Sequence, residues 1–148
     1  MTNGKILLVE DEEADIELII GALRRHNVSN EIDVARDGEQ ALDFLYRRGE
    51  FEQLQGDYPV LVLLDLKMPK VGGIEVLRTM KLDNTLKNIA VVVLTSSREN
   101  PDIQQCYTLG VNAYVVKPID FEEFSEAIKI VGLFWLLVNE PPSGSVPG

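Results

Sequence analysis

The sequence predicts an α/β fold, a doubly wound parallel sheet of five strands covered by five helices. Short apolar runs alternate with longer amphipathic segments along the chain, which is typical of strands and helices in alternation. Two of the runs, Val60–Leu64 and Ile89–Leu94, are continuously apolar, as central strands buried on both faces are. The length of 148 residues suits one domain with a substantial core.

Five apolar runs have the length of strands and are bounded by turn-forming residues. We expect the strands to be Ile6–Val9, Ile32–Ala35, Val60–Leu64, Ala90–Leu94 and Ala113–Val116. The second run differs from the others, because charged and apolar residues alternate from Glu31 to Val34. Such alternation favours an edge strand with one wet face.

Helical periodicity lies between the strands and after the last one. The first expected helix runs from about Glu12 to His26, with acidic residues in its first turn and basic residues in its last, as the helix dipole favours. Four further helices are expected, from Asp37-Gly38, after Gly72-Gly73, from Asn100-Pro101 to Gly110, and from Asp120 to Pro141-Pro142. Residues 1–140 would thus form the domain, and residues 141–148 a flexible tail.

Composition and charge narrow the class of function. The chain carries 14 basic and 24 acidic residues, a formal net charge of −10, and no basic cluster, so nucleic acid is disfavoured as a partner. A single cysteine, Cys106, excludes an intrachain disulfide and a thiolate metal site. The longest apolar segment, Ile130–Val138, falls short of the roughly 20 residues that span a bilayer. Since the start of the chain does not resemble a signal peptide, we expect a cytoplasmic protein with no membrane partner.

Polar side chains follow the apolar runs at the point where each strand should end. Glu10 and Asp11 follow the first run, Asp65 the third, Thr95 the fourth and Lys117 the fifth. Open parallel sheets bind their ligands beyond the carboxyl ends of the strands. We therefore expect three carboxylates, a hydroxyl and an amine to converge on one edge of the sheet.

Three carboxylates in one place repel one another unless a cation neutralises them. Mg²⁺ prefers carboxylate, carbonyl and water oxygens, and it leaves room for a phosphoryl group. A carboxylate such as Asp65 can attack phosphorus as a nucleophile, and Lys117 and Thr95 would then spread the charge on the phosphoryl oxygens. The strand ends thus predict a phosphoryl-accepting site with magnesium as its cofactor.

Four short motifs carry a resemblance to a known family. They are Leu-Val-Glu-Asp at 8–11, Leu-Leu-Asp-Leu-Lys-Met-Pro-Lys-Val-Gly-Gly at 63–73, Val-Leu-Thr-Ser at 93–96 and Val-Lys-Pro at 116–118. Together, in this order and on these strand ends, they resemble the receiver domains of bacterial response regulators. The resemblance spans about residues 5–138 and implies a flavodoxin-like sheet with strand order 2-1-3-4-5.

The resemblance implies a role for each motif residue. Asp65 would be the phosphoacceptor, and Mg²⁺ would be held by Glu10, Asp11, Asp65 and the backbone carbonyl of Lys67. A glutamate at position 10 departs from the family's commoner aspartate, and its longer side chain suggests contact with the metal through water.

The resemblance also implies how the signal enters and leaves. Thr95 and Lys117 would contact the phosphoryl group, the Lys117-Pro118 peptide bond would be cis, and Tyr114 stands at the position of the aromatic switch. The donor would be a phosphohistidine on a sensor histidine kinase. The chain would be a signalling protein rather than an enzyme, with slow autodephosphorylation.

A narrower resemblance concerns small regulators that are partnered with bacterial phytochromes. It rests on the acidic start Glu-Asp-Glu-Glu-Ala-Asp, the long connection Arg47–Tyr58 and the ending Phe-Trp-Leu-Leu-Val-Asn-Glu-Pro-Pro. It implies that a light-responsive histidine kinase is the upstream partner.

The last expected helix carries more apolar residues than one inward face needs. Phe134, Trp135 and Leu137 spread apolar surface around it, which favours homodimerisation or partner docking through this helix. The alternative is that part of this surface packs under the Arg47–Tyr58 connection. Since no output domain follows residue 138, we expect the signal to leave through protein contacts.

Each motif also has an ordinary structural interpretation. Asp65 would cap a turn, Lys117 would be solvated before a proline, and Tyr114 would simply pack in its strand. We interpret Glu12, Glu13, Asp15 and Glu17 as a solvated helix start that matches the dipole.

Three other functions remain to be weighed. A haloacid-dehalogenase-type hydrolase would need an aspartate where Lys67 stands. A flavodoxin-like cofactor module would need a phosphate-cradling loop where the chain has Glu10 to Glu13. A degenerate receiver would act only as a protein-binding scaffold.

Overall fold

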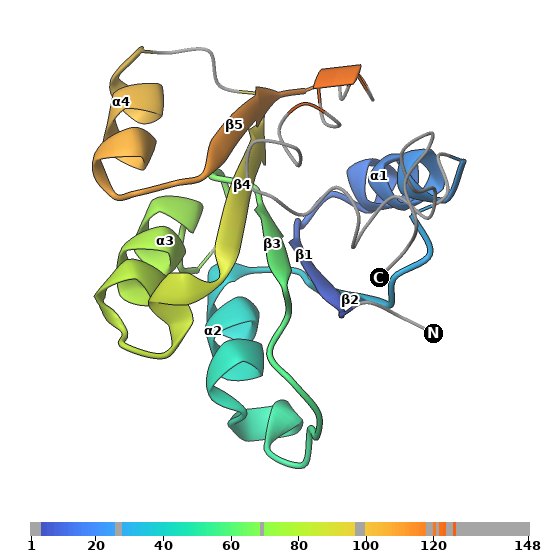
Figure 1. The fold of residues 1–148 in the computed structure, drawn as a ribbon, viewed down its shortest axis with the longest axis vertical. Coiled ribbons are helices and arrows are strands. Elements are labelled where there is room, and N and C mark those ends of the chain that lie inside the picture. The colour runs from blue at the N-terminus through green and yellow to red at the C-terminus, as the bar shows by residue number, and fades with distance from the viewer. Residues whose placement is uncertain are drawn as a thin grey trace, which may run out of the picture.

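The computed structural model describes residues 4–25, 28–68, 70–96 and 100–117, together with 120, 122–123 and 126. In this part of the chain, five parallel strands form one sheet with the order β2-β1-β3-β4-β5 (Figure 1). The strands are β1 (Ile6–Val9), β2 (Ile32–Ala35), β3 (Leu61–Leu64), β4 (Ala90–Thr95) and β5 (Ala113–Val116). The expected strand order is confirmed, and β2 is an edge strand as its alternating pattern predicted.

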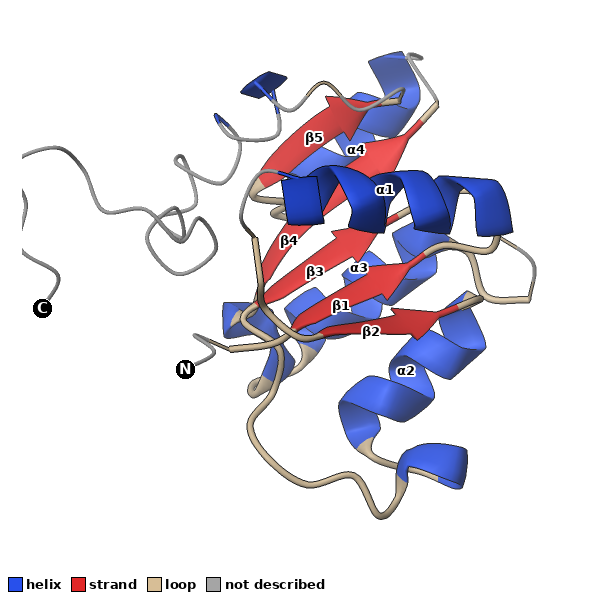
Figure 2. Cartoon of the chain, turned by 90° about the vertical axis from the view of Figure 1, so that its right-hand side faces the viewer, coloured by secondary structure: helices blue, strands red, loops and turns tan. Residues whose placement is uncertain are grey.

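Four α-helices of the described part cover the two faces of the sheet. They are α1 (Glu13–Arg25), α2 (Gly38–Tyr46), α3 (Gly73–Leu82) and α4 (Asn100–Thr108). Among these four helices, α1 lies on one face of the sheet, and α2, α3 and α4 lie on the other (Figures 1 and 2). Two short 3₁₀ helices, η1 (Gly49–Phe51) and η2 (Leu86–Asn88), stand in the connections before β3 and β4. None of the helices described is long and apolar enough to cross a membrane.

The predicted elements agree with the observed ones to within one or two residues. The fifth predicted helix, with Phe134, Trp135 and Leu137, lies almost entirely outside the described residues, and so do the tail 141–148 and Pro118 with its predicted cis bond.

Two hydrophobic clusters sandwich the sheet, one on each face. Alternate side chains of β1 and β3 point to opposite sides, so Leu7 and Val62 join one cluster while Leu8 and Leu63 join the other. The first cluster contains the buried faces of α2, α3 and α4, including Cys106, and the second contains the buried face of α1. This double burial explains why the central strands are continuously apolar.

The long connection after α2 is part of the folded domain. Its residue Phe51 packs edge-on against Phe44 of α2, with ring centroids 5.3 Å apart. The guanidinium of Arg47 lies 4.9 Å from the centre of the Tyr58 ring. Phe51 thus ties the connection to α2, and Arg47 and Tyr58 hold its two ends together. Phe51 and Leu54 also pack against the first hydrophobic cluster.

Two glycines allow the loop after β3 to lie close to its neighbours. A Cβ on Gly73 would lie 2.2 Å from the carbonyl oxygen of Asp65, and one on Gly38 would lie 1.9 Å from the carbonyl oxygen of Val71. Side chains do not fit at such distances, so glycine is required for these backbones to approach. The loop that follows Asp65 is therefore held against both α2 and α3.

We expect Gly73→Ala to lower the free energy of unfolding by about 2 kcal/mol, because the added methyl group must displace the backbone of Asp65. Gly21→Ala is the matched control. This glycine lies within α1, where a Cβ meets only the Arg25 side chain at 3.5 Å, so the free energy of unfolding should rise by about 0.5–1 kcal/mol. Urea denaturation measures both. Equal shifts in the two variants would contradict the close approach.

Candidate functional site

The sheet's hydrogen bonds continue one residue beyond several strands, and this continuation places the candidate groups together. The backbone N–H of Glu10 donates to the Ala35 carbonyl at 2.9 Å, and that of Asp65 donates to the Val9 carbonyl at 3.0 Å. The N–H of Lys117 donates to the Thr95 carbonyl at 2.8 Å. The polar residues that follow the apolar runs are thus fixed in register at one sheet edge.

Three carboxylates share this edge. One oxygen from each of Glu10, Asp11 and Asp65 can be chosen so that all lie within 4.8 Å of one another. Glu10 and Asp65 are buried, with exposed fractions of 1% and 7%. Hard oxygen ligands at this spacing suit a divalent cation, and their mutual repulsion gives such an ion a large charge to neutralise. The predicted convergence of the three carboxylates is confirmed.

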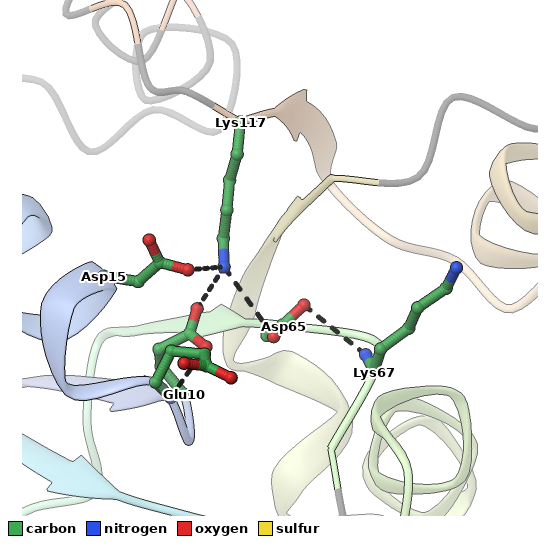
Figure 3. Close-up of polar contacts among 6 residues, drawn as sticks. Glu10, Asp15, Asp65, Lys67 and Lys117 are labelled. Carbon is green, nitrogen blue, oxygen red and sulfur yellow. Dashed lines mark hydrogen bonds and ion pairs between the residues drawn. The ribbon is translucent and has the colours of Figure 1, made fainter.

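Lys117 reaches this acidic group from the end of β5 (Figure 3). Its ammonium donates a hydrogen bond to Glu10 Oε1 and another to Asp15 Oδ2 at 2.9 Å, and it forms an ion pair with Asp65 Oδ2 at 3.7 Å. The second Glu10 oxygen accepts a hydrogen bond of 3.3 Å from the backbone N–H of Glu12. One ammonium therefore serves three carboxylates.

Burial controls the ionisation of this group. Desolvation raises the pKa of Glu10 from 4.5 to about 7, although the hydrogen bond from Lys117 opposes the rise. For Lys117, burial alone would lower the pKa, but the hydrogen bonds to Glu10 and Asp15, together with the attraction of the Asp65 and Glu10 carboxylates, raise it. The lysine is thus held as an ammonium ion.

Asp65 and Thr95 lie at the ends of adjacent strands. Oδ1 of Asp65 accepts a hydrogen bond of 3.4 Å from the backbone N–H of Lys67, whose side chain is exposed. Thr95 is fully buried. The metal-binding role of the Lys67 carbonyl stays a prediction.

Tyr114 lines a surface hollow. The side chain is half-buried and packs against the first hydrophobic cluster. It lines the hollow with Tyr107, Val115 and the acidic residues Glu122, Glu123 and Glu126. Cys106 is buried, and burial raises the pKa of its thiol to about 11, so the thiol is protonated at neutral pH.

Asp15 stands in the acidic first turn of α1, as interpreted, but its side chain is only 35% exposed and has a partner that the sequence did not reveal. Its side chain contacts the Lys117 ammonium, 102 positions away in the chain. No motif marks it, because its partner is found only once α1 is placed over the strand ends. The only indication in the sequence is that Asp15 stands four positions after Asp11, a spacing of about one helical turn.

Comparison with known proteins places these residues in a family. The model of the response regulator receiver domain matches residues 6–129. A probable methanogenesis regulatory protein, FilR2 of Methanothrix harundinacea, is 41% identical over 93% of this chain and 86% of its own length. The response regulator Rcp1 of Synechocystis sp. is 40% identical, over 88% of both proteins.

Solved structures show the same likeness. The bacteriophytochrome response regulator AtBRR is 52% identical, with a TM-score of 0.84 over 93% of this chain and 98% of that one. The phosphorylated cyanobacterial phytochrome response regulator RcpA is 40% identical, with a TM-score of 0.76. The Mn²⁺-bound form of Rcp1 is 36% identical, with a TM-score of 0.75. The RcpA and Rcp1 matches each cover 98% of this chain and 99% of the other.

The raised pKa of Glu10 predicts how the stability of the metal-free protein depends on pH. Between pH 4.5 and about 7 the folded chain keeps a proton on Glu10 that the unfolded chain has released, so this contribution to stability is complete below pH 4.5 and is lost as the pH rises to about 7. The difference in free energy of unfolding between wild type and Glu10→Gln should fall across this window by on the order of 3 kcal/mol.

Denaturant titrations with a chelator present, at a series of pH values, measure this difference. Glu17→Gln removes an exposed carboxyl from α1 and is the control for the loss of one ionisable side chain. A difference between wild type and Glu10→Gln that does not change across the window would show that Glu10 titrates normally.

Proposed function

The chain belongs to the response regulator receiver domain family, and from this premise we propose that it accepts a phosphoryl group on Asp65 from a sensor histidine kinase. The observation that carries the proposal is the position of Asp65. Like Glu10, Asp65 is a buried carboxylate of the group of three that forms an ion pair with Lys117. Unlike Glu10, it lies beyond hydrogen-bond distance of the ammonium, at 3.7 Å. A nucleophile with a cation beside it and a metal-binding set around it suits phosphoryl transfer.

In the proposed step, a carboxylate oxygen of Asp65 attacks the phosphorus of a phosphohistidine. The new O–P bond forms as the P–N bond breaks, and the electron pair of that bond leaves with the imidazole nitrogen. The product is an acyl phosphate on Asp65. Lys117 and Thr95 would donate hydrogen bonds to the phosphoryl oxygens, and they would lower the energy of the developing charge.

Glu10, Asp11 and Asp65 are the residues that would hold a magnesium ion, with the Lys67 carbonyl as a fourth ligand. The ion would neutralise the carboxylates and polarise the phosphoryl oxygens. Two observations support the fit. The three carboxylates offer hard oxygen ligands within 4.8 Å of one another, and Rcp1 has been solved with Mn²⁺.

We propose that the readout is a change of surface. When Thr95 shifts toward the phosphoryl group, it vacates space that Tyr114 can enter, and the surface of α4 and β5 repacks. The hollow beside Tyr114 lies on this surface. On this proposal the protein is a cytoplasmic signalling protein, and its slow autodephosphorylation ends the signal.

The proposed upstream partner is a phytochrome histidine kinase. The likeness to AtBRR supports this, although FilR2 is as similar as Rcp1 and is named for a different process. Transfer from an autophosphorylated bacterial phytochrome, faster than from a histidine kinase of another class, would support the assignment, and equal rates would refute it.

A homodimer through Phe134, Trp135 and Leu137 is also proposed, with residues 1–140 as the receiver domain and 141–148 as a tail. It rests on the apolar surplus of this segment in the sequence. Sedimentation should show a dimer that Trp135→Ala weakens at least about tenfold, since buried tryptophans dominate interfaces. A monomeric wild type would refute it.

The Asp65→Asn variant tests the central proposal. With magnesium and acetyl phosphate, wild type should gain one phosphoryl group and Asp65→Asn none, because the amide cannot act as the nucleophile. Intact-mass measurement records the gain. Asp57→Asn removes an exposed aspartate from the connection before β3 and should be labelled as wild type is. Labelling of Asp65→Asn would refute the assignment, and no labelling of folded wild type would leave the scaffold function in its place.

A further inference from the structure

Lys117 is held away from Asp65 by its other partners. Its ammonium is in hydrogen-bond contact with Glu10 and Asp15, whereas Asp65 stands at 3.7 Å, beyond hydrogen-bond distance (Figure 3). In the proposed function this same ammonium must reach the phosphoryl group on Asp65. Lys117 must therefore break at least one of its hydrogen bonds to Glu10 and Asp15 during transfer.

The two partners differ in what a metal ion would do to them. Glu10 belongs to the group of three carboxylates that can meet at one ion, so a divalent cation there would share its charge and repel the ammonium. Asp15 does not belong to that group among the described residues. Its carboxylate would therefore keep its full attraction for Lys117 after metal binding.

Asp15 is well placed for this contact. It lies in the first turn of α1, and its side chain is 35% exposed while that of Lys117 is 14% exposed. The hydrogen bond of 2.9 Å joins the helix start to the end of β5. A charge-assisted hydrogen bond in this half-buried setting is stronger than an exposed ion pair, yet weak enough for a phosphoryl dianion to displace.

We infer that Asp15 is a positioning residue that holds the Lys117 ammonium on the α1 side of the site and so slows phosphorylation of Asp65. The inference rests on the proposed function. The carboxylate of Asp15, at the start of α1, then competes with the phosphoryl group for the Lys117 ammonium. Asp15 itself neither binds the metal nor touches the phosphoryl group.

The test compares Asp15→Asn with Glu17→Gln in the full chain. Both changes remove one negative charge from α1, but residues two positions apart face different sides of a helix, and Glu17 is exposed. Acetyl phosphate with saturating magnesium is the donor. In this reaction the O–P bond to Asp65 forms as the P–O bond to acetate breaks, and the electron pair leaves with acetate.

We expect Asp15→Asn to raise the initial rate of labelling about threefold to tenfold over Glu17→Gln, as loss of one charge-assisted hydrogen bond implies. A rate equal to or below that of Glu17→Gln would overturn the inference. Failure of wild type to become labelled would instead overturn the proposed function, so the two failures are distinguishable.

A second readout needs neither metal nor donor. In protein with ¹⁵N-labelled lysine, the ammonium signal of Lys117, assigned by its loss in Lys117→Met, should be protected from exchange with water by its hydrogen bonds. The signal should broaden in Asp15→Asn and persist in Glu17→Gln. An unchanged signal in Asp15→Asn would show that the contact does not hold the lysine.

Discussion

Negative charge gathered at one edge of the sheet is the condition on which the site depends. Glu10, Asp11 and Asp65 lie within a few ångströms of one another, two of them buried, and their repulsion would push the strand ends apart without a cation. Lys117 supplies that cation from within the chain. Burial, and to a lesser extent the negative charge of Asp65, raises the pKa of Glu10 to about 7. The resting site is therefore balanced by a lysine that the proposed reaction must redirect.

The scaffold holds these charges in register. Strands that are buried on both faces cannot slide along one another without exposing apolar side chains. The residues that follow the strands are therefore fixed in position relative to one another at the sheet edge. The close approaches at Gly38 and Gly73 fix the loop after Asp65 in the same way. The fold thus stabilises a group of like charges through contacts that are themselves apolar or backbone-to-backbone.

The family assignment separates the competing functions. A haloacid-dehalogenase-type hydrolase would need an acid/base at position 67, where an exposed lysine stands. A phosphate-cradling cofactor module would need donors after β1, where the chain has two carboxylates of the acidic group. The match to the receiver model over residues 6–129 agrees with both exclusions.

The sequence by itself determined the strands, the strand order through the family resemblance, and the convergence of Glu10, Asp11, Asp65 and Lys117. These follow from local patterns, since an apolar run marks a strand and a parallel sheet brings the strand ends together. Only the tertiary structure decided that Asp15 faces Lys117, because the orientation of α1 over the sheet depends on packing by Ile16, Ile19 and Leu23. It also decided the pKa of Glu10, which depends on burial that no local pattern records.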